Sequence, residues 1–243
     1  MNSATTMTTT TTAGTAIVTG ATSGIGRAIA RKLLENGYTV YGIGRNESGA
    51  PVHENFHLLR VDLADAAAIE QTVRPIAAEV TLLVNSAGAA YYGPHESLSP
   101  QAIVEMTAVN VAAPMILSAL LLPHLRTCAG TIVNVSSVTA RNTSNTHACA
   151  YGATKAALSS FSDSLFEEYR RHGVRVITIH PDLTDTNLYR NADFTPKNDP
   201  QYCLSPEEIA DCILPALSTR SGMVVTNFTV RPQRNGIDRK PHE

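Results

Sequence analysis

The chain is poor in several residue types that mark particular classes of protein. Its 243 residues include no tryptophan, four cysteines and only 5% aromatic residues. The cysteines form no CxxC pair and no His-linked pattern of a metal site, and four thiols over this length do not resemble a disulfide scaffold. We therefore expect free thiols in a reducing compartment and no metal. One domain is expected, because α/β chains of this length commonly share a single core.

The chain also lacks an excess of charge of one sign and lacks long apolar runs. Lys and Arg number 19 against 21 Asp and Glu, so the net charge of -2 offers no binding field to nucleic acid or to an anionic membrane. The longest apolar run, residues 111–122, falls short of the ~20 residues that span a bilayer. Residues 1–14 hold seven threonines and no charge, so they lack the features of a secretory signal, and we expect a disordered tail. These observations predict a cytoplasmic protein with a small-molecule partner.

After this tail, short β-branched apolar runs alternate with longer stretches of helical periodicity. The alternation is typical of a doubly wound parallel sheet with helices on both faces, here of about seven strands in a domain over 15–231, followed by a polar tail at 232–243. The predicted strands are 15–19, 39–44, 56–60, 81–85, 130–136, 174–180 and 223–230. The predicted helices are one from Ile25 to Asn36 and those at 64–79, 100–127, 148–172 and 206–218. Only ten residues separate Arg45 from Phe56, so the second crossover is predicted to lack a full helix.

The first predicted strand leads into a glycine-rich turn, Thr19-Gly20-Ala21-Thr22-Ser23-Gly24-Ile25-Gly26, and then into an amphipathic helix. Glycines permit a tight turn and let backbone N–H groups and the helix N-terminus approach a pyrophosphate. The spacing G-x-x-x-G-x-G differs from the more general G-x-G-x-x-G fingerprint. The turn therefore indicates a dinucleotide site only together with other signals.

The end of the second predicted strand distinguishes between the two nicotinamide dinucleotides. It reads Gly42-Ile43-Gly44-Arg45-Asn46, without the carboxylate that usually holds the adenosine ribose hydroxyls. Arg45, assisted by Ser23 or Asn46, can bind a 2′-phosphate, which predicts NADP; a solvated loop arginine is the alternative. Asp62, after the third strand, can accept a hydrogen bond from the adenine amino group or cap the following helix.

A catalytic pair is predicted in the helix at 148–172. Tyr151 and Lys155 are four residues apart, which brings phenol and ammonium to one face. A neighbouring cation favours the phenolate, so we expect the tyrosine pKa of ~10 to fall toward the working pH. Ser137 ends the preceding strand, at the edge where open parallel sheets place ligands, and can bind the reacting oxygen. Asn110 can hold a water or distort its helix, unless it faces solvent.

Together, these motifs resemble the classical short-chain dehydrogenase/reductase (SDR) family over residues 15–230. The resemblance implies a Rossmann-type fold, an oxidoreductase that uses a nicotinamide dinucleotide, and a homodimer or homotetramer; the prediction of NADP rests on Arg45 and on the missing carboxylate. It also implies that Tyr151 transfers the proton and that Lys155 binds the ribose and lowers the tyrosine pKa. Ser137 then orients the carbonyl, and Asn110 holds a water of a proton relay. The expected cofactor-binding residues are Gly20, Ser23, Gly24, Ile25, Gly26, Arg45, Asn46, Asp62, Leu63, Asn85, Ala87, Gly88, Tyr151, Lys155 and Thr186.

The chain departs from the family pattern at four points. Ser86 replaces the second asparagine of the Asn-Asn-Ala-Gly motif, the second crossover is short, and Asp182 stands where the family has glycine. The segment between Ser137 and Tyr151 is one residue longer than usual. This extra residue leaves Ser136 as a rival to Ser137.

The predicted reaction is the reversible reduction of a small aldehyde or ketone by NADPH to the alcohol. If Arg141 or Arg190 faces inward, it would suit an anionic substrate such as a 3-oxo acid, semialdehyde or sulfoacetaldehyde. Surface arginines around an apolar pocket are the alternative. A catalytically silent NADP-binding sensor or scaffold is the rival function, although Tyr151 and Lys155 are both present. The candidate substrate contacts are Ser137, Arg141, Asn142, Tyr189 and Arg190. Further pocket candidates are Tyr91, Tyr92, His95 and His147.

Overall fold

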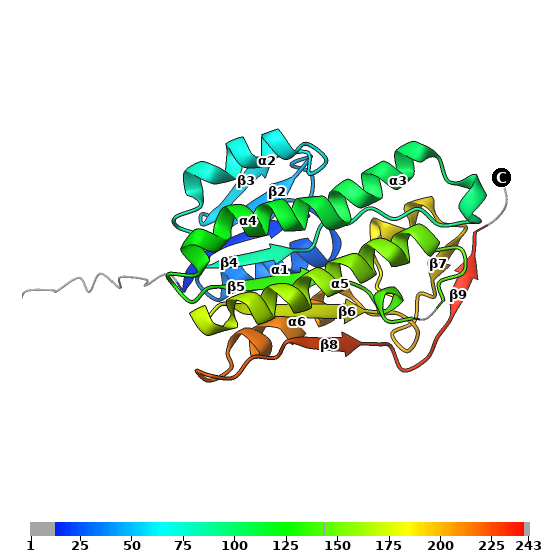
Figure 1. The fold of residues 1–243 in the computed structure, drawn as a ribbon. Coiled ribbons are helices and arrows are strands. Elements are labelled where there is room, and N and C mark those ends of the chain that lie inside the picture. The colour runs from blue at the N-terminus through cyan, green and yellow to red at the C-terminus, as the bar shows by residue number, and fades with distance from the viewer. Residues whose placement is uncertain (1–12, 143, 241–243) are drawn as a thin grey trace, which may run out of the picture.

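A computed structural model describes residues 13–142 and 144–240, and these fold around one seven-stranded parallel sheet (Figure 1). The strand order is β3-β2-β1-β4-β5-β6-β8, which confirms the predicted single-domain, Rossmann-type fold. The direction of winding reverses between β1 and β4, so a crevice is expected at the carboxyl ends of these strands. The strand bounds are β1 Gly14–Thr19, β2 Tyr38–Gly44, β3 Phe56–Arg60, β4 Leu82–Asn85, β5 Thr131–Val135, β6 Arg175–Pro181 and β8 Asn227–Val230.

Helices cover both faces of the sheet, and alternate residues of each strand point to the two layers (Figure 1). Val18, Val84 and Val133 share a buried cluster with α1 and α6, while Ile17 and Leu83 share a second cluster with α2, α4 and α5. Both faces of the strands are apolar because both are covered. The helix bounds are α1 Gly24–Glu35, α2 Ala66–Val73, α3 Pro100–Thr107, α4 Ala113–Leu125, α5 Cys149–Tyr169 and α6 Pro206–Leu217.

Two predicted helices differ from the structure in detail. The helix expected at 64–79 is shorter, because Pro75 lies in a 3-10 turn that follows α2. The helix expected at 100–127 is divided by a π-helical turn, Ala108–Ala112, which contains Asn110. Such turns frequently mark functional sites, and this one confirms the expected helix distortion at Asn110. No helix lies between β2 and β3 in the described structure, which confirms the short second crossover.

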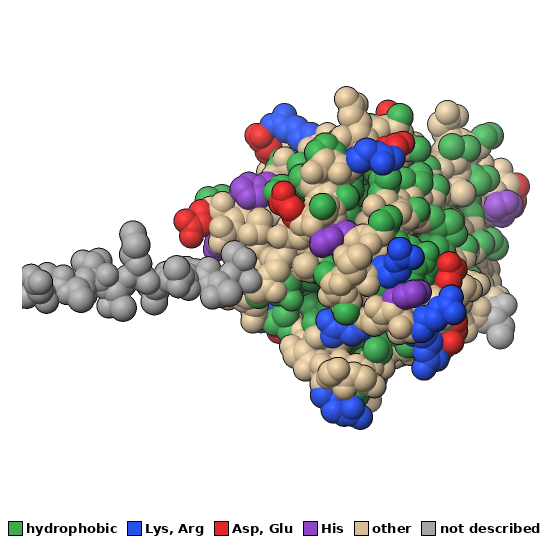
Figure 2. Space-filling view, turned by 60° about the vertical axis from the view of Figure 1, so that its left-hand side comes forward, with side chains coloured by type: hydrophobic (Ala, Val, Ile, Leu, Met, Phe, Trp, Pro, Cys, Tyr) green, Lys and Arg blue, Asp and Glu red, His purple; other side chains and the backbone are tan. Residues whose placement is uncertain are grey.

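Together, α3, the π turn and α4 form one helical stretch of 26 residues, Pro100–Leu125, which by length and composition alone could cross a membrane. Leu117, Leu121 and Leu125 of this stretch are fully buried against the sheet. Of the apolar 18-residue window in this stretch, 44% is buried, so packing in the core accounts for part of its apolar composition. Figure 2 shows acidic, basic and histidine side chains interspersed over one side of the molecule, in keeping with the small net charge.

A second sheet was not predicted. Strands β7 (Phe194–Pro196) and β9 (Ile237–Arg239) pair antiparallel at the carboxyl end of the main sheet (Figure 1). The expectation of a polar C-terminal tail at 232–243 is therefore wrong for residues 237–239. Each of these strands has only three residues, which is too few to show the period-two pattern of a strand. The two strands also lie far apart in the sequence, at 194–196 and 237–239. Of the expected tail at 1–14, residues 1–12 lie outside the described residues, and Gly14 begins β1.

Candidate active site

A cavity of about 810 Å³ lies at the carboxyl ends of the central strands, where the crevice was expected. Its volume falls in the range of small-molecule and cofactor sites. The glycine turn after β1 lines one end, which we call the nucleotide end; Ser137, Tyr151 and Tyr189 line the other, which we call the substrate end.

The glycine turn is held in a form that larger side chains would disrupt. Gly20 and Gly24 have φ angles of 70° and 50°. A Cβ on Gly26 would lie 2.4 Å from the Gly20 carbonyl oxygen, so only glycine lets α1 approach β1 this closely. Ser23 precedes α1 without a side-chain cap hydrogen bond. The first N–H groups of α1, which have no partner within the helix, can therefore bind an anion in the cavity.

Arg45 and Asn46 line the nucleotide end, as do Asp62 and Leu63. The nearest acidic residue after β2 in the sequence, Glu47, pairs with Arg60, and neither of these two lines the cavity.

The expected alternative for Asp62, capping of the next helix, is not found. Asp62 Oδ1 accepts a hydrogen bond from the Ala64 N–H at 3.0 Å within its own turn. The cap of α2 is Asp65, which accepts from the Ala68 N–H at 3.0 Å.

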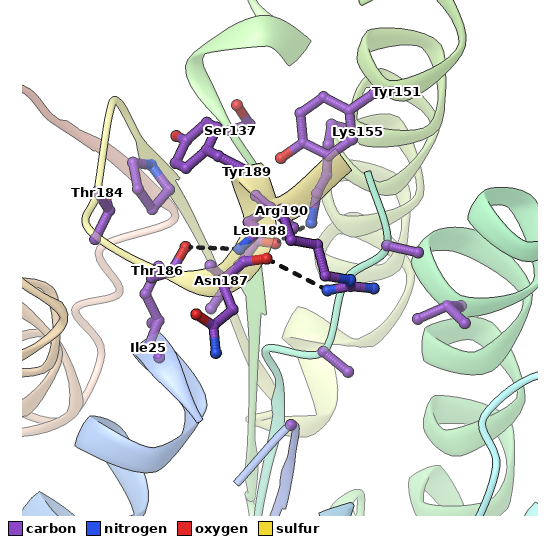
Figure 3. A pocket seen from close by; sticks show the side chains of 18 of the residues that line it. Ile25, Ser137, Tyr151, Lys155, Thr184, Thr186, Asn187, Leu188, Tyr189 and Arg190 are labelled. Carbon is purple, nitrogen blue, oxygen red and sulfur yellow. Dashed lines mark hydrogen bonds between the residues drawn. The ribbon is translucent and has the colours of Figure 1, made fainter. Parts of the chain in front are cut away.

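At the substrate end, α5 brings together the two predicted catalytic side chains. Tyr151 and Lys155 are each 4% exposed, and the Lys155 Nζ lies 5.9 Å from the centre of the Tyr151 ring. Lys155 Nζ donates a hydrogen bond to the Val135 carbonyl at 2.8 Å. Figure 3 shows Ser137 and Tyr151 at the same end of the pocket.

The electrostatics differ from the expectation for Tyr151. Burial raises the pKa of Tyr151 to about 12, and the hydrogen bond with Ser137 acts in the opposite direction. Burial lowers the pKa of Lys155 to about 8. The predicted lowering of the Tyr151 pKa is wrong for this structure, because desolvation of the phenol dominates that pKa. Lys155 is not among the causes of the shift, and its ammonium donates to the Val135 carbonyl. The phenol carries its proton at neutral pH.

The structure separates the two rival serines. Ser136 Oγ donates to the Lys155 carbonyl at 3.0 Å and lies 2.9 Å from Ser159 Oγ, so its hydroxyl is engaged with α5. Ser137 Oγ accepts a hydrogen bond from the Thr139 N–H at 3.2 Å and keeps its own proton for Tyr151 or a ligand. Ser137 therefore has the geometry expected for a residue that binds the reacting oxygen.

Asn110 is fully buried, which excludes the solvent-facing alternative. Its amide accepts from the Ala89 N–H and donates to the Ala89 carbonyl, both at 2.8 Å, and donates to Thr154 Oγ1 at 3.0 Å. Thr154 Oγ1 in turn donates to the Tyr151 carbonyl at 2.7 Å. Asn110 thus ties the turn after β4 to the helix turn that carries Tyr151; its expected water stays a prediction.

Known proteins share both the sequence pattern and the fold. The short chain dehydrogenase family model matches residues 14–196. The chain belongs to this family. An uncharacterized oxidoreductase of Staphylococcus epidermidis is 31% identical over 226 residues, which cover 89% of this chain and 96% of that protein. Serine 3-dehydrogenase of Agrobacterium fabrum is 33% identical over 184 residues, 72% of this chain and 74% of that protein.

Solved structures agree with this assignment. A short chain dehydrogenase of Burkholderia cenocepacia in complex with NADP superposes with a TM-score of 0.77 at 27% identity, covering 90% of this chain and 88% of that one. This short-chain dehydrogenase is therefore an oxidoreductase of a family that uses nicotinamide dinucleotides.

Several residues expected at the site of this short-chain dehydrogenase point elsewhere. The Asn85 amide is buried and donates to Asn134 Oδ1 at 2.8 Å, joining β4 to β5 instead of lining the cavity. Arg141 is exposed and donates to Asn227 Oδ1 at 3.0 Å, near the start of β8. Neither lies among the residues that line the cavity, and neither do Tyr91 and His95. The place of each of these residues in the sequence suggested that it lines the site. The direction in which its side chain points could not be predicted from that place.

The segment after β6 forms a roof, which we define as residues 186–196. Thr186 packs on Gly24: a Cβ added to Gly24 would lie 3.1 Å from Thr186 Cγ2. Leu188 packs near Gly88, where an added Cβ would lie 3.9 Å from Leu188 Cδ1. The roof therefore spans the cavity from the α1 side to the β4 side. Figure 3 shows Arg190 of the roof pointing away from Ser137 and Tyr151, and its Nη1 donates to the Asn187 carbonyl at 3.3 Å.

Sequence reasoning missed the residues that complete the substrate end. Phe194 of β7 and Ile237 and Arg239 of β9 line the cavity, together with Asp193. The one available signal was an aromatic residue, Phe194, shortly after Tyr189 in the sequence. The contribution of β9 depends on its pairing with a distant segment, which no local sequence pattern indicates.

Proposed function

We propose that the protein is an NADPH-dependent reductase that converts an aldehyde or ketone to the alcohol. The observation that carries the proposal is a buried, protonated Tyr151 beside Ser137, at the far end of a cavity whose other end is the glycine turn and Arg45. A catalytic acid must hold its proton at the working pH and must lie where a substrate oxygen can reach it. Tyr151 meets the first condition, and its place in the cavity favours the second.

The residues at the nucleotide end fit a nicotinamide dinucleotide. The close approach of Gly26 to Gly20 and the unpartnered N–H groups of α1 suit a diphosphate. Arg45 suits a 2′-phosphate through charge-assisted hydrogen bonds, and Lys155 suits a ribose hydroxyl. The bound dinucleotide supplies the hydride. The preference for NADP over NAD is inferred from Arg45 and from Glu47 being paired with Arg60.

The side chains then divide the work of reduction. Ser137 donates a hydrogen bond to the carbonyl oxygen and holds it beside the Tyr151 hydroxyl. As negative charge develops on that oxygen, Tyr151 gives up its proton to form the alcohol. Lys155, whose ammonium donates to the Val135 carbonyl, would hold a ribose hydroxyl of the dinucleotide next to this phenol. Because burial raises the pKa of Tyr151 to about 12, the phenol starts in the protonated form that this proton transfer requires.

The substrate end favours an uncharged carbonyl over an anionic one. Of the two arginines that suggested an anion, Arg141 bonds to Asn227 outside the cavity, and Arg190 lines the cavity but points away from Tyr151. A third arginine that lines the cavity, Arg239, is paired with Asp193. The walls next to Tyr151 are aromatic, so we propose that small aldehydes and ketones without a carboxylate or sulfonate are preferred.

A panel of small neutral and anionic aldehydes and ketones tests this function. The purified protein is given each carbonyl with NADPH and, in parallel, with NADH, and dinucleotide oxidation is followed. We expect turnover with NADPH that exceeds turnover with NADH, and better use of the neutral carbonyls. Tight NADPH binding without turnover of any carbonyl would instead support the silent sensor or scaffold.

A further inference from the structure

The chain's C-terminal strand reaches the substrate end of the cavity. Phe194, Thr195 and Pro196 of β7 pair with Arg239, Asp238 and Ile237 of β9, and Ile237 and Arg239 line the cavity. Figure 1 shows β9 rising beside β7 at the end of the molecule where the sheet strands terminate. A segment more than forty residues away in sequence is thereby added to the wall of the site.

Polar contacts fasten this segment to the roof. Lys240 Nζ donates to the carbonyls of Tyr189 at 2.8 Å and of Arg190 at 3.2 Å, and the Lys240 N–H donates to the Asp193 carbonyl at 2.8 Å. The Asp193 carboxylate is also the ion-pair partner of Arg239. We call residues 237–240 the clasp. The clasp contacts the roof at Tyr189, Arg190 and Asp193, and through the β7–β9 pairing at 194–196. All of these roof residues follow Leu188 in the sequence.

The part of the roof that the clasp holds carries two of the aromatic walls. Tyr189 stacks on Tyr92 with ring centres 5.9 Å apart, and Phe194 meets Tyr92 edge-on at 5.3 Å. Tyr92 in turn lies 5.7 Å from Tyr151. Burial raises the pKa of Tyr92 and of Tyr189, so these walls stay uncharged. The clasp therefore fixes rings that pack around the catalytic phenol.

We propose that the clasp is a specificity-determining element of the substrate site. It forms one wall through Ile237 and positions Tyr189 and Phe194, and so it sets the affinity for the carbonyl without binding the dinucleotide. Among the described residues, no hydrogen bond or ion pair joins the clasp to Gly20, Gly26 or Arg45 of the nucleotide end. The inference rests on the proposed reductase function for its kinetic readout, and Lys240 is a positioning residue within it.

The variant Lys240→Gln tests the clasp with little risk to folding, because Lys240 is half-buried and lies outside the seven-stranded sheet and its two core clusters. Loss of two hydrogen bonds from a charged donor is expected to raise the KM for the best carbonyl of the panel about fivefold to tenfold. The Kd for NADPH, measured by its fluorescence, and kcat should stay near parent values. Lys240→Arg retains the charge and donors, so it should restore the parent KM to within about twofold.

A matched control is Lys32→Gln, which removes a lysine that bonds to Asp211 on the far side of the sheet from α5. It should leave the KM for the carbonyl unchanged. A chain ending at Gly236 removes the whole clasp and should raise that KM further, again with NADPH binding retained. Equal KM values for the parent and Lys240→Gln would overturn the clasp and leave the reductase function standing.

A second readout does not depend on turnover. Amide hydrogen exchange of residues 187–196 should be faster in Lys240→Gln than in the parent, with the exchange of residues 20–30 unchanged. If no carbonyl is turned over, the reductase function fails, and this measurement alone decides on the clasp. Unchanged exchange in the roof would then overturn it.

Discussion

The two ends of the cavity are built in different ways. The nucleotide end comes largely from one short stretch, the turn between β1 and α1, together with the residues that directly follow β2 and β3. The substrate end is assembled from four segments, around residues 92, 137–151, 186–196 and 237–240. A fixed turn can bind the constant part of a dinucleotide, whereas a wall made of loops can differ between family members that act on different substrates.

The two ends also differ in burial. Tyr151 and Lys155 at the substrate end are almost fully buried, whereas Arg45 at the nucleotide end is exposed. Charges and hydrogen bonds act more strongly in a desolvated site than at the surface. We therefore expect substitutions around Tyr151 to have larger effects than those at Arg45, and the following predictions test that order.

Apart from loss of the Tyr151 hydroxyl itself, the largest effect is expected at Ser137. Ser137→Ala removes the hydroxyl that binds the reacting oxygen, and kcat should fall by about a hundredfold, as for the loss of one oxyanion donor. Ser136→Ala is the matched control, because its hydroxyl bonds to α5 and not to substrate. That variant should keep kcat and lose about 1 kcal/mol of unfolding free energy in urea. A reversed pattern would assign the catalytic serine to Ser136.

The pH dependence comes next in size. Lys155 is charged below a pKa of about 8 and neutral above it, while Tyr151 keeps its proton across this range. The kcat/KM for NADPH, which reports the free enzyme, should fall about tenfold per pH unit above pH 8. Lys155→Arg keeps the charge at all accessible pH values and should remove the fall. A flat profile in the parent would show that the Lys155 charge is not used.

A smaller effect is expected for exposed Arg45. Arg45→Asp should raise the Kd for NADPH about tenfold, as for the loss of a partly solvated charge-assisted hydrogen bond, and leave the Kd for NADH little changed. Arg74→Asp is the control, since Arg74 pairs with Glu70 on the surface away from the cavity. Equal affinities of the parent for the two dinucleotides would contradict the role given to Arg45.

The sequence was informative where chemistry and neighbouring residues coincide. The glycine spacing and the four-residue interval from Tyr151 to Lys155 are local, and the structure places these groups in one cavity. The alternating apolar runs predicted the seven-stranded sheet because both faces of its strands are buried. Local pattern also anticipated the short second crossover.

The features that could not be predicted depend on the orientation of side chains and on contacts between segments that are far apart in the sequence. Asn85 and Arg141 lie at the expected positions in the chain, but their side chains bond to Asn134 and Asn227 instead of facing the cavity. The pairing of β7 with β9 is set by contacts between distant segments. The raised pKa of Tyr151 follows from burial, which the spacing of two residues does not reveal.

The most direct test of the central claim is Tyr151→Phe, assayed with NADPH and the best carbonyl of the panel. The phenyl ring keeps the aromatic packing with Tyr92 but has no proton to give. We expect turnover to fall by about a thousandfold, within the range for loss of a general acid, and the Kd for NADPH to stay at the parent value. Turnover at the parent rate by Tyr151→Phe would contradict the account, because the proton would then have another source.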